Sequence, residues 1–240
     1  MNQPKRTRKE LRGAIIGMVM GDGCLCQNPF RDGSKRGNYK LDINHSVRQE
    51  DYLKHKKDVV NVLFDYEIPI TNKRVHLKET GKTYFQKRMQ TRVHPRFKFI
   101  ANQIYIDGKK RITPWVLDNI TIEGLSYWWM DDGCLHIRKS AKGFQVIWGT
   151  YGFLKEDVER FREWLIDKYD IHLNLNKHCK SGWYLKRGSY EACKLCDLLK
   201  PYSIPSMNYK FDYEKSFYKN RNHDLFSNSN NSACYPVLTG

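Results

Sequence analysis

Residues 122–133 read Ile-Glu-Gly-Leu-Ser-Tyr-Trp-Trp-Met-Asp-Asp-Gly, an apolar run that ends in two carboxylates and a glycine. The pattern predicts a buried helix that carries Asp131 and Asp132 at its C-terminal end, with Gly133 in a left-handed cap. The negative end of the helix dipole disfavours carboxylates there by up to ~1 kcal/mol. A bound divalent cation would offset that cost; the alternative is an ordinary buried helix with a polar C-cap.

The same pattern occurs a second time, nearer the N-terminus. Residues 20–25 read Met-Gly-Asp-Gly-Cys-Leu and residues 130–135 read Met-Asp-Asp-Gly-Cys-Leu, so the two differ at one position. An apolar stretch precedes each copy, and Thr7 with Glu10 predicts a capping box at the start of the first helix. This similarity indicates an internal duplication and two similar halves.

Three glycines mark one face of the first predicted helix. Gly13, Gly17 and Gly21 recur every fourth residue, although a glycine in a helix interior costs about 1 kcal/mol. Close approach of another backbone is the expected reason. We expect the second motif helix to be that partner, which would place Asp22 and Asp132 side by side.

The net charge points to a polyanionic partner. Lys and Arg number 42 against 26 Asp and Glu, which gives a formal charge of +16. Nucleic acid is the first candidate and an anionic membrane surface the second. The apolar runs of about eight residues are shorter than the ~20 that a membrane-spanning helix needs, so no membrane partner is expected. The basic start is not followed by an apolar signal segment, which predicts an intracellular protein in a bacterial or phage-host cytoplasm or an organelle.

Cysteine usage agrees with a reducing compartment. Seven cysteines are spread over 240 residues, an odd number in a chain too large to need disulfides. Cys193 and Cys196 have the spacing of a zinc ligand pair, but no second such pair is present. We expect both thiols to face a core, with structural zinc as the alternative.

Alternating patterns predict strands with one packed face and one face of cations and amides. Glu79 is the only acid between residues 68 and 106, whereas a solvated outer face usually mixes both signs. Such side chains contact base edges and phosphates, so the predicted face favours nucleic acid. The expected DNA contacts are Lys40, Asn44, Arg74, His76, Gln86, Arg88, Gln90 and Arg92 in the first half and Arg138, Gln145, Asn174, Asn176, Lys186 and Arg187 in the second.

Each half reads as helix, two strands, helix, two strands, helix, which predicts an α+β fold with two pseudo-symmetric halves. The expected divisions are a basic N-terminal arm (residues 1–6), a first half (7–115), a second half (116–215) and a flexible C-terminal tail (216–240).

These residues also resemble a known family. Ile15-Ile-Gly-Met-Val-Met-Gly-Asp22-Gly23 and Leu125-Ser-Tyr-Trp-Trp-Met-Asp-Asp132-Gly133 are similar to the paired signature of LAGLIDADG homing endonucleases. The block Leu199-Lys-Pro-Tyr-x-Ile-Pro-x-Met-x-Tyr-Lys210 adds similarity to the I-SceI type. The resemblance implies a monomer whose two αββαββα halves form a saddle over double-stranded DNA. It also implies double-strand cleavage of a long asymmetric target that leaves 3′ overhangs.

The resemblance also implies a metal site. Asp22 and Asp132 match the essential metal ligands, each serving one DNA strand, with the carbonyls of Gly21 and Asp131 as further ligands and the Asp131 side chain as accessory. Phosphodiester hydrolysis needs an activated water and charge neutralisation, which divalent ions between carboxylates supply. Hard oxygen ligands favour Mg²⁺, for which Mn²⁺ is expected to substitute.

A cation is expected beside each scissile phosphate. Lys210 matches the C-terminal active-site lysine of the family. The corresponding block in the first half is Lys109-Lys110-Arg111-Ile-Thr-Pro114. Lys110 is the candidate there, and Arg111 stands at the position that aligns with the family pattern.

Two other classes of function fit the same fold. One is an intron maturase, an RNA-binding splicing factor with intron RNA as its partner, and the other is a non-catalytic DNA-binding regulator. The retention of both Asp22 and Asp132 favours cleavage, because a protein that only binds could lose either carboxylate.

Overall fold

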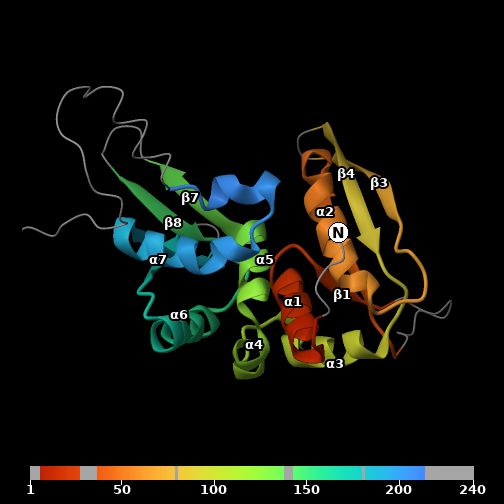
Figure 1. Ribbon diagram of the computed structural model, residues 1–240, viewed down its shortest axis with the longest axis horizontal. Coiled ribbons are helices and arrows are strands. Elements are labelled where there is room, and N and C mark those ends of the chain that lie inside the picture. Colours follow the sequence, from red (N-terminus) through yellow and green to blue (C-terminus); the bar gives the residue numbers. More distant parts are fainter. Residues whose placement is uncertain (1–5, 28–36, 79–80, 138–142, 180–181, 214–240) are drawn as a thin grey trace, which may run out of the picture. The chain divides into compact units, whose positions relative to one another are not determined.

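The computed structural model describes residues 6–27, 37–78, 81–137, 143–179 and 182–213. The chain packs as two units, Met1–Asp131 and Asp132–Gly240 (Figure 1). The predicted tail and most of the predicted N-terminal arm lie outside the described residues. The repeat in the sequence places the division at residue 115, whereas packing places it at Asp131 because the second motif helix packs within the first unit.

The first unit alternates helices with antiparallel strands. In chain order it contains α1 (Arg8–Met20), β1 (Cys24–Cys26), β2 (Lys40–Ser46), α2 (Glu50–Asn61), β3 (Ile70–Leu77), β4 (Lys82–Gln90), α3 (Pro95–Ile104), β5 (Tyr105–Ile106), β6 (Lys109–Lys110), α4 (Pro114–Asn119) and α5 (Ile122–Asp132), whose last residue belongs to the second unit.

Helix α1 begins where the sequence predicts. The Glu10 backbone N–H donates to the Thr7 hydroxyl, and the Glu10 carboxylate accepts from the Thr7 backbone N–H (2.7 Å), so the capping box is confirmed. Arg6, which the sequence assigns to a basic arm, instead forms an ion pair with Glu123 at 2.8 Å.

The glycines of α1 lie against α5 within the first unit. A Cβ atom added to Gly17 would lie 1.8 Å from the Gly124 carbonyl oxygen, and one added to Gly124 would lie 2.1 Å from the Gly13 carbonyl oxygen. Real side chains cannot tolerate such distances, so both helices need glycine where they meet. The expected close packing of the two motif helices is confirmed.

The sheet of the first unit has the order β1-β2-β4-β3, with antiparallel neighbours. Leu41, Ile43 and Met89 are fully buried on one face, and α2 packs against β2 and β4 (Figure 1). The strands alternate, so the intervening side chains, such as Asn44, lie on the opposite face.

The second unit repeats this arrangement. In chain order it contains β7 (Gly133–Ile137), β8 (Phe144–Trp148), α6 (Lys155–Tyr169), β9 (Asn174–His178), β10 (Gly182–Gly188), α7 (Ser189–Leu199) and the 3₁₀ helices η2 (Lys200–Tyr202) and η3 (Pro205–Lys210). Its sheet order, β7-β8-β10-β9, is equivalent to that of the first unit. The α+β class and the pseudo-symmetry of the two halves are therefore confirmed.

The core of the second unit lies between its sheet and helices α6 and α7. Trp148 and Phe161 are fully buried and meet edge to face with ring centroids 4.9 Å apart. Cys193 and Cys196 are also buried, as expected for thiols that face a core.

The end of the second motif differs from the prediction. Gly133 is absent from the positive-φ glycines of the described chain and instead begins β7, paired with Trp148. The left-handed cap is therefore wrong, because the chain passes directly from the helix into a sheet and needs extended backbone there. Helix α3 ends at Ile104, where the short β5–β6 hairpin starts.

Among the described residues, no helix combines the length and the hydropathy that a membrane span requires.

Candidate active site

Asp22 lies in the short turn between α1 and β1, with 46% of its side chain exposed. The Lys110 ammonium on β6 donates to the Gly21 and Gly23 carbonyl oxygens, each at 2.8 Å. Lys110 therefore contacts the backbone on both sides of Asp22.

Asp131, expected to be an accessory metal ligand, has a fully buried side chain. Its Oδ1 accepts from Lys56 Nζ at 2.7 Å and from the Tyr52 hydroxyl at 2.9 Å. Its Oδ2 accepts from Lys56 Nζ at 2.8 Å and from the Asp22 backbone N–H at 2.9 Å. Protein donors thus satisfy the whole carboxylate, and one of them fixes the backbone at Asp22.

The one difference between the two motifs has a structural explanation. A Cβ atom on Gly21 would lie 2.3 Å from Asp131 Oδ2. Asp131 occupies the position in the second motif that Gly21 occupies in the first. The glycine of one motif therefore leaves room for the carboxylate of the other.

Lys56 is a fully buried cation on α2. It falls within the apolar stripe of this helix, between Leu53 and Val59, and its ammonium lies 4.2 Å from the centroid of the Tyr52 ring. Its pairing with Asp131 compensates for the burial of both charges. Burial, followed by the charge of Asp131, holds the pKa of the Tyr52 hydroxyl well above its ordinary value, so this group stays a hydrogen-bond donor.

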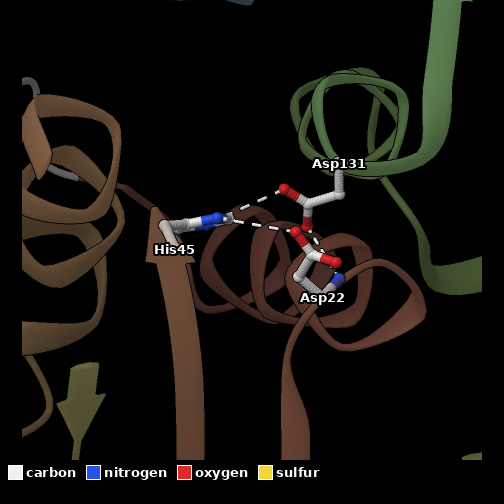
Figure 2. Close-up of side chains that lie close together, drawn as sticks. All are labelled: Asp22, His45 and Asp131. Carbon is white, nitrogen blue, oxygen red and sulfur yellow. Dashed lines mark hydrogen bonds and ion pairs between the residues drawn. The ribbon is translucent and has the colours of Figure 1, made fainter. Parts of the chain in front are cut away.

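His45 points from β2 toward both carboxylates (Figure 2). Its Nδ1 lies 3.5 Å from Asp22 Oδ2, and its Nε2 lies 3.1 Å from Lys56 Nζ and 3.9 Å from Asp131 Oδ1. The imidazole is buried, with 3% of the residue exposed.

Three potential metal ligands gather at this point. One ligand atom each from Asp22, His45 and Asp131 lie within 4.8 Å of one another. The Lys56 ammonium, however, contacts both Asp131 and His45, so a cation already stands on that side of the cluster. The outward carboxylate of Asp22 is the member that fits a Mg²⁺ ion, which accepts one or two carboxylates and keeps several waters. The Gly21 carbonyl, expected as a further ligand, accepts from Lys110.

The second unit presents its own motif end. The Asp132 carbonyl oxygen accepts from the Gly149 backbone N–H at 3.0 Å, just beyond β8. Lys210, the predicted cation of this half, is 9% exposed in η3, which packs against β7. β7 directly follows Asp132 in the chain.

The open face of the first sheet carries five of the predicted DNA contacts. The register places Asn44 opposite Arg88, and alternation puts Lys40, Gln86 and Gln90 on the same face. This face is not purely cationic. Asp42 accepts from Arg88 Nε at 2.9 Å and from Gln90 Nε2 at 3.0 Å, and a second Arg88 nitrogen contacts its other oxygen.

The Asp42 carboxyl has a lowered pKa. Burial alone would raise it, but the Arg88 guanidinium and the Gln90 amide outweigh that effect. Asp42 therefore stays ionised and holds both side chains in fixed positions across the strands.

Arg74 and His76 do not share this face. Arg74 pairs with Phe85 and His76 with Thr83, which places them with Met89 on the face that α2 covers farther along the sheet. The predicted alternation is therefore one residue out of phase in β3, whereas it is correct in β4. Phe85, opposite Arg74, is 63% exposed.

Lys73 occupies the position that the sequence predicts for Arg74. It lies on the open face and donates to Asn44 Oδ1 at 3.2 Å. Arg92 follows the end of β4 and is therefore not part of the sheet face. Its guanidinium lies over the Tyr66 ring, 4.2 Å from the ring centroid.

The open face of the second sheet agrees better with the prediction. Asn174 pairs with Lys186 and Asn176 with Tyr184, and Gln145 pairs with His136 on the same face. Arg187 pairs with Val146, so alternation places it on the opposite face, although its guanidinium donates to Asn174 Oδ1 at 2.9 Å. Arg138 lies outside the described residues.

Sequence reasoning missed His45, Lys56 and Tyr52. A signal was present for the first two: His45 continues the alternation of Leu41 and Ile43, and Lys56 interrupts an apolar helical stripe. A polar side chain at a core position predicts a buried partner. The identity of that partner, Asp131, required the fold.

Comparison with known proteins agrees with this architecture. The model of the LAGLIDADG DNA endonuclease family matches residues 12–195. Probable intron-encoded endonuclease 1 of Wickerhamomyces canadensis is 30% identical over 203 residues, which cover 82% of this chain and 81% of that protein. Protein RecA of Mycolicibacterium flavescens is 27% identical over 219 residues, and the match spans 87% of this chain but only 48% of that protein.

One solved structure shows the same fold over most of the chain. The homing endonuclease I-WcaI, bound to its DNA recognition sequence, matches with a TM-score of 0.73 and 24% identity, over 88% of this chain and 89% of that one. At this identity the likeness concerns the fold. The family match covers more than half of the sequence and includes the ends of both motif helices, and on that basis the chain belongs to the LAGLIDADG DNA endonuclease family.

Proposed function

We propose that this protein is a site-specific homing endonuclease that binds double-stranded DNA as a monomer and cuts both strands of a long asymmetric target with Mg²⁺, leaving 3′ overhangs. The observation that carries the proposal is Asp22. A carboxylate 46% exposed stands at the end of a motif helix, with the Lys110 ammonium on the flanking backbone, in a chain of this family.

The relatives support a DNA substrate. One is named an intron-encoded endonuclease, and the I-WcaI structure contains a DNA recognition sequence. In this chain, open sheet faces with amides and cations, such as Asn44 with Arg88 and Asn174 with Lys186, fit base edges and phosphates.

Asp22 and Asp132 are the residues that would hold Mg²⁺, each for one strand. Bound there, the ion would supply an activated water and neutralise charge on the phosphate. Asp22 offers an outward carboxylate oxygen, Lys110 places positive charge beside it, and Lys210 is proposed for the same role in the second unit. Asp131 keeps the Asp22 backbone in place through its buried carboxylate.

Cleavage of a randomised duplex library tests the proposal. The protein with Mg²⁺ is incubated with the library, and cleaved ends are sequenced. We expect a single long asymmetric consensus with 3′ overhangs, and no cut products when EDTA replaces Mg²⁺. Recovery of uncut DNA alone, or of cuts without any consensus, would contradict a site-specific endonuclease.

A further inference from the structure

His45 lies between two groups of the first unit that are far apart in the sequence, the Asp22 carboxylate and the Lys56 ammonium. One ring nitrogen faces the exposed Asp22 carboxylate at 3.5 Å, and the other faces the buried Lys56 ammonium at 3.1 Å (Figure 2). The ring is held in place by burial and by Tyr52, whose ring centroid lies 4.9 Å away.

The contacts of Lys56 determine which nitrogen of the His45 ring carries the proton. Lys56 Nζ lies 2.7 and 2.8 Å from the two oxygens of Asp131, so it is an ammonium whose remaining hydrogen points to His45 Nε2. An ammonium has no lone pair, and Nε2 must therefore accept. The proton of a neutral imidazole then sits on Nδ1, directed at Asp22.

We infer that His45 is a positioning residue, which donates from Nδ1 to Asp22 and so orients the carboxylate for its metal ion, with Asp131 and Lys56 fixing the histidine tautomer from behind. Groups that orient a metal ligand typically change metal affinity or activity 10- to 100-fold when removed. This inference rests on the proposed function of Asp22, and it adds two residues, His45 and Lys56, that no motif of the sequence identifies.

An alternative is that Asp22, His45 and Asp131 together form a metal site. Lys56 argues against that reading, since its ammonium lies between Asp131 and His45 Nε2. In the arrangement inferred here His45 keeps its Nδ1 proton, whereas a ligating nitrogen would have to lose it. The two arrangements therefore differ in whether His45 Nδ1 carries a proton when the metal ion is present, and this can be measured.

Nitrogen-15 NMR of histidine-labelled protein measures that proton without DNA or activity. We expect His45 to appear as the neutral Nδ1–H tautomer and to remain so when Mg²⁺ is added. Lys56→Met removes the donor to Nε2 and should allow the other tautomer to appear. An Nε2–H tautomer in the wild type, or loss of the Nδ1 proton on addition of Mg²⁺, would overturn the inference.

Two substitutions of His45 test separately the roles of its two ring nitrogens. In His45→Asn the amide can replace Nδ1 and still donate to Asp22, while in His45→Gln the amide reaches the Nε2 position and loses Asp22. On the target recovered with the wild type, His45→Gln should cleave about 10- to 100-fold more slowly, with DNA binding in Ca²⁺ unchanged, and His45→Asn should stay closer to the wild type.

His55→Gln is the matched control, because this histidine of α2 contacts the Tyr127 hydroxyl at 2.9 Å and not Asp22. Equal cleavage by both His45 variants and the wild type would contradict the positioning role. Failure of the wild type to cleave any target, with the Nδ1–H tautomer observed, would instead contradict the proposed function and leave the network intact.

Discussion

At the residue scale, the Lys56–Asp131 ion pair carries a large desolvation cost, since both side chains have 0% exposure. Two charges of opposite sign are removed from water together, and neither is tolerable without the other. The pair lies between α2 and α5 of the first unit, and through Asp131 it also fixes the backbone N–H of Asp22. A residue that looks like a metal ligand in the motif is therefore a structural anchor.

Replacing Lys56 by Met should destabilise the protein by about 3–5 kcal/mol, because Asp131 would keep a buried charge without its partner. The free energy of unfolding from urea titrations measures the effect. Lys54→Met is the control, since Lys54 is 58% exposed and pairs with Glu50 on the surface, where such pairs contribute at most ~1 kcal/mol. Equal losses for the two variants would show that burial of the pair does not matter.

Asp42 gives a stability effect with a defined pH dependence. Its folded-state pKa is lowered, so its contribution is present above the unfolded-state pKa and is lost as the pH falls through the folded one. We expect Asp42→Asn to lower the melting temperature near pH 7 and to match the wild type in strong acid, with the gap narrowing below about pH 5. A gap that is constant across this range would contradict the ionised state of Asp42.

At the scale of elements, the glycines of α1 determine how the first unit packs. Gly17 lies against the Gly124 backbone of α5, and this contact was predictable because glycine at every fourth position has no other physical reason. The order of helices and long strands followed from periodicity in the same way.

Other elements could not be predicted from local pattern. β1 spans only Cys24–Cys26, too short for alternation to be detected. In β3 the predicted phase is one residue out, as the pairing of Arg74 with Phe85 shows. The buried partner of Lys56 is 75 residues away in sequence, and no spacing rule connects such positions.

Gly17→Ala tests the helix contact directly. The added methyl carbon would lie 1.8 Å from the Gly124 carbonyl oxygen, so the helices must separate and the loss should exceed about 4 kcal/mol. Circular dichroism during thermal unfolding measures it. Gly152→Ala, where nothing lies within 4 Å of the added atom, should change the melting temperature by no more than a degree or two, and a similarly small change at Gly17 would refute the close contact.

At the scale of the whole molecule, a charge of +16 implies affinity dominated by phosphates. The dissociation constant for the recovered target should rise about 10³- to 10⁵-fold between 50 and 200 mM salt if six to ten phosphates are contacted. Lys186→Gln on the second open face should reduce the slope of log affinity against log salt by about 1, and Lys54→Gln on α2 should leave it unchanged. A dissociation constant that does not change with salt would contradict the proposal that the positive charge binds DNA phosphates.

The proposed cleavage mechanism requires that Asp22 acts by holding a metal ion and not only by stabilising the fold. The most direct measurement is the rate of double-strand cleavage by Asp22→Asn with Mg²⁺, alongside its affinity for the same target in Ca²⁺. We predict that cleavage is abolished while the dissociation constant stays within about threefold of the wild-type value, since one hydrogen-bonding carboxylate becomes an amide of the same shape. Cleavage at the wild-type rate would contradict the assignment of Asp22 and, with it, the mechanism proposed for the first unit.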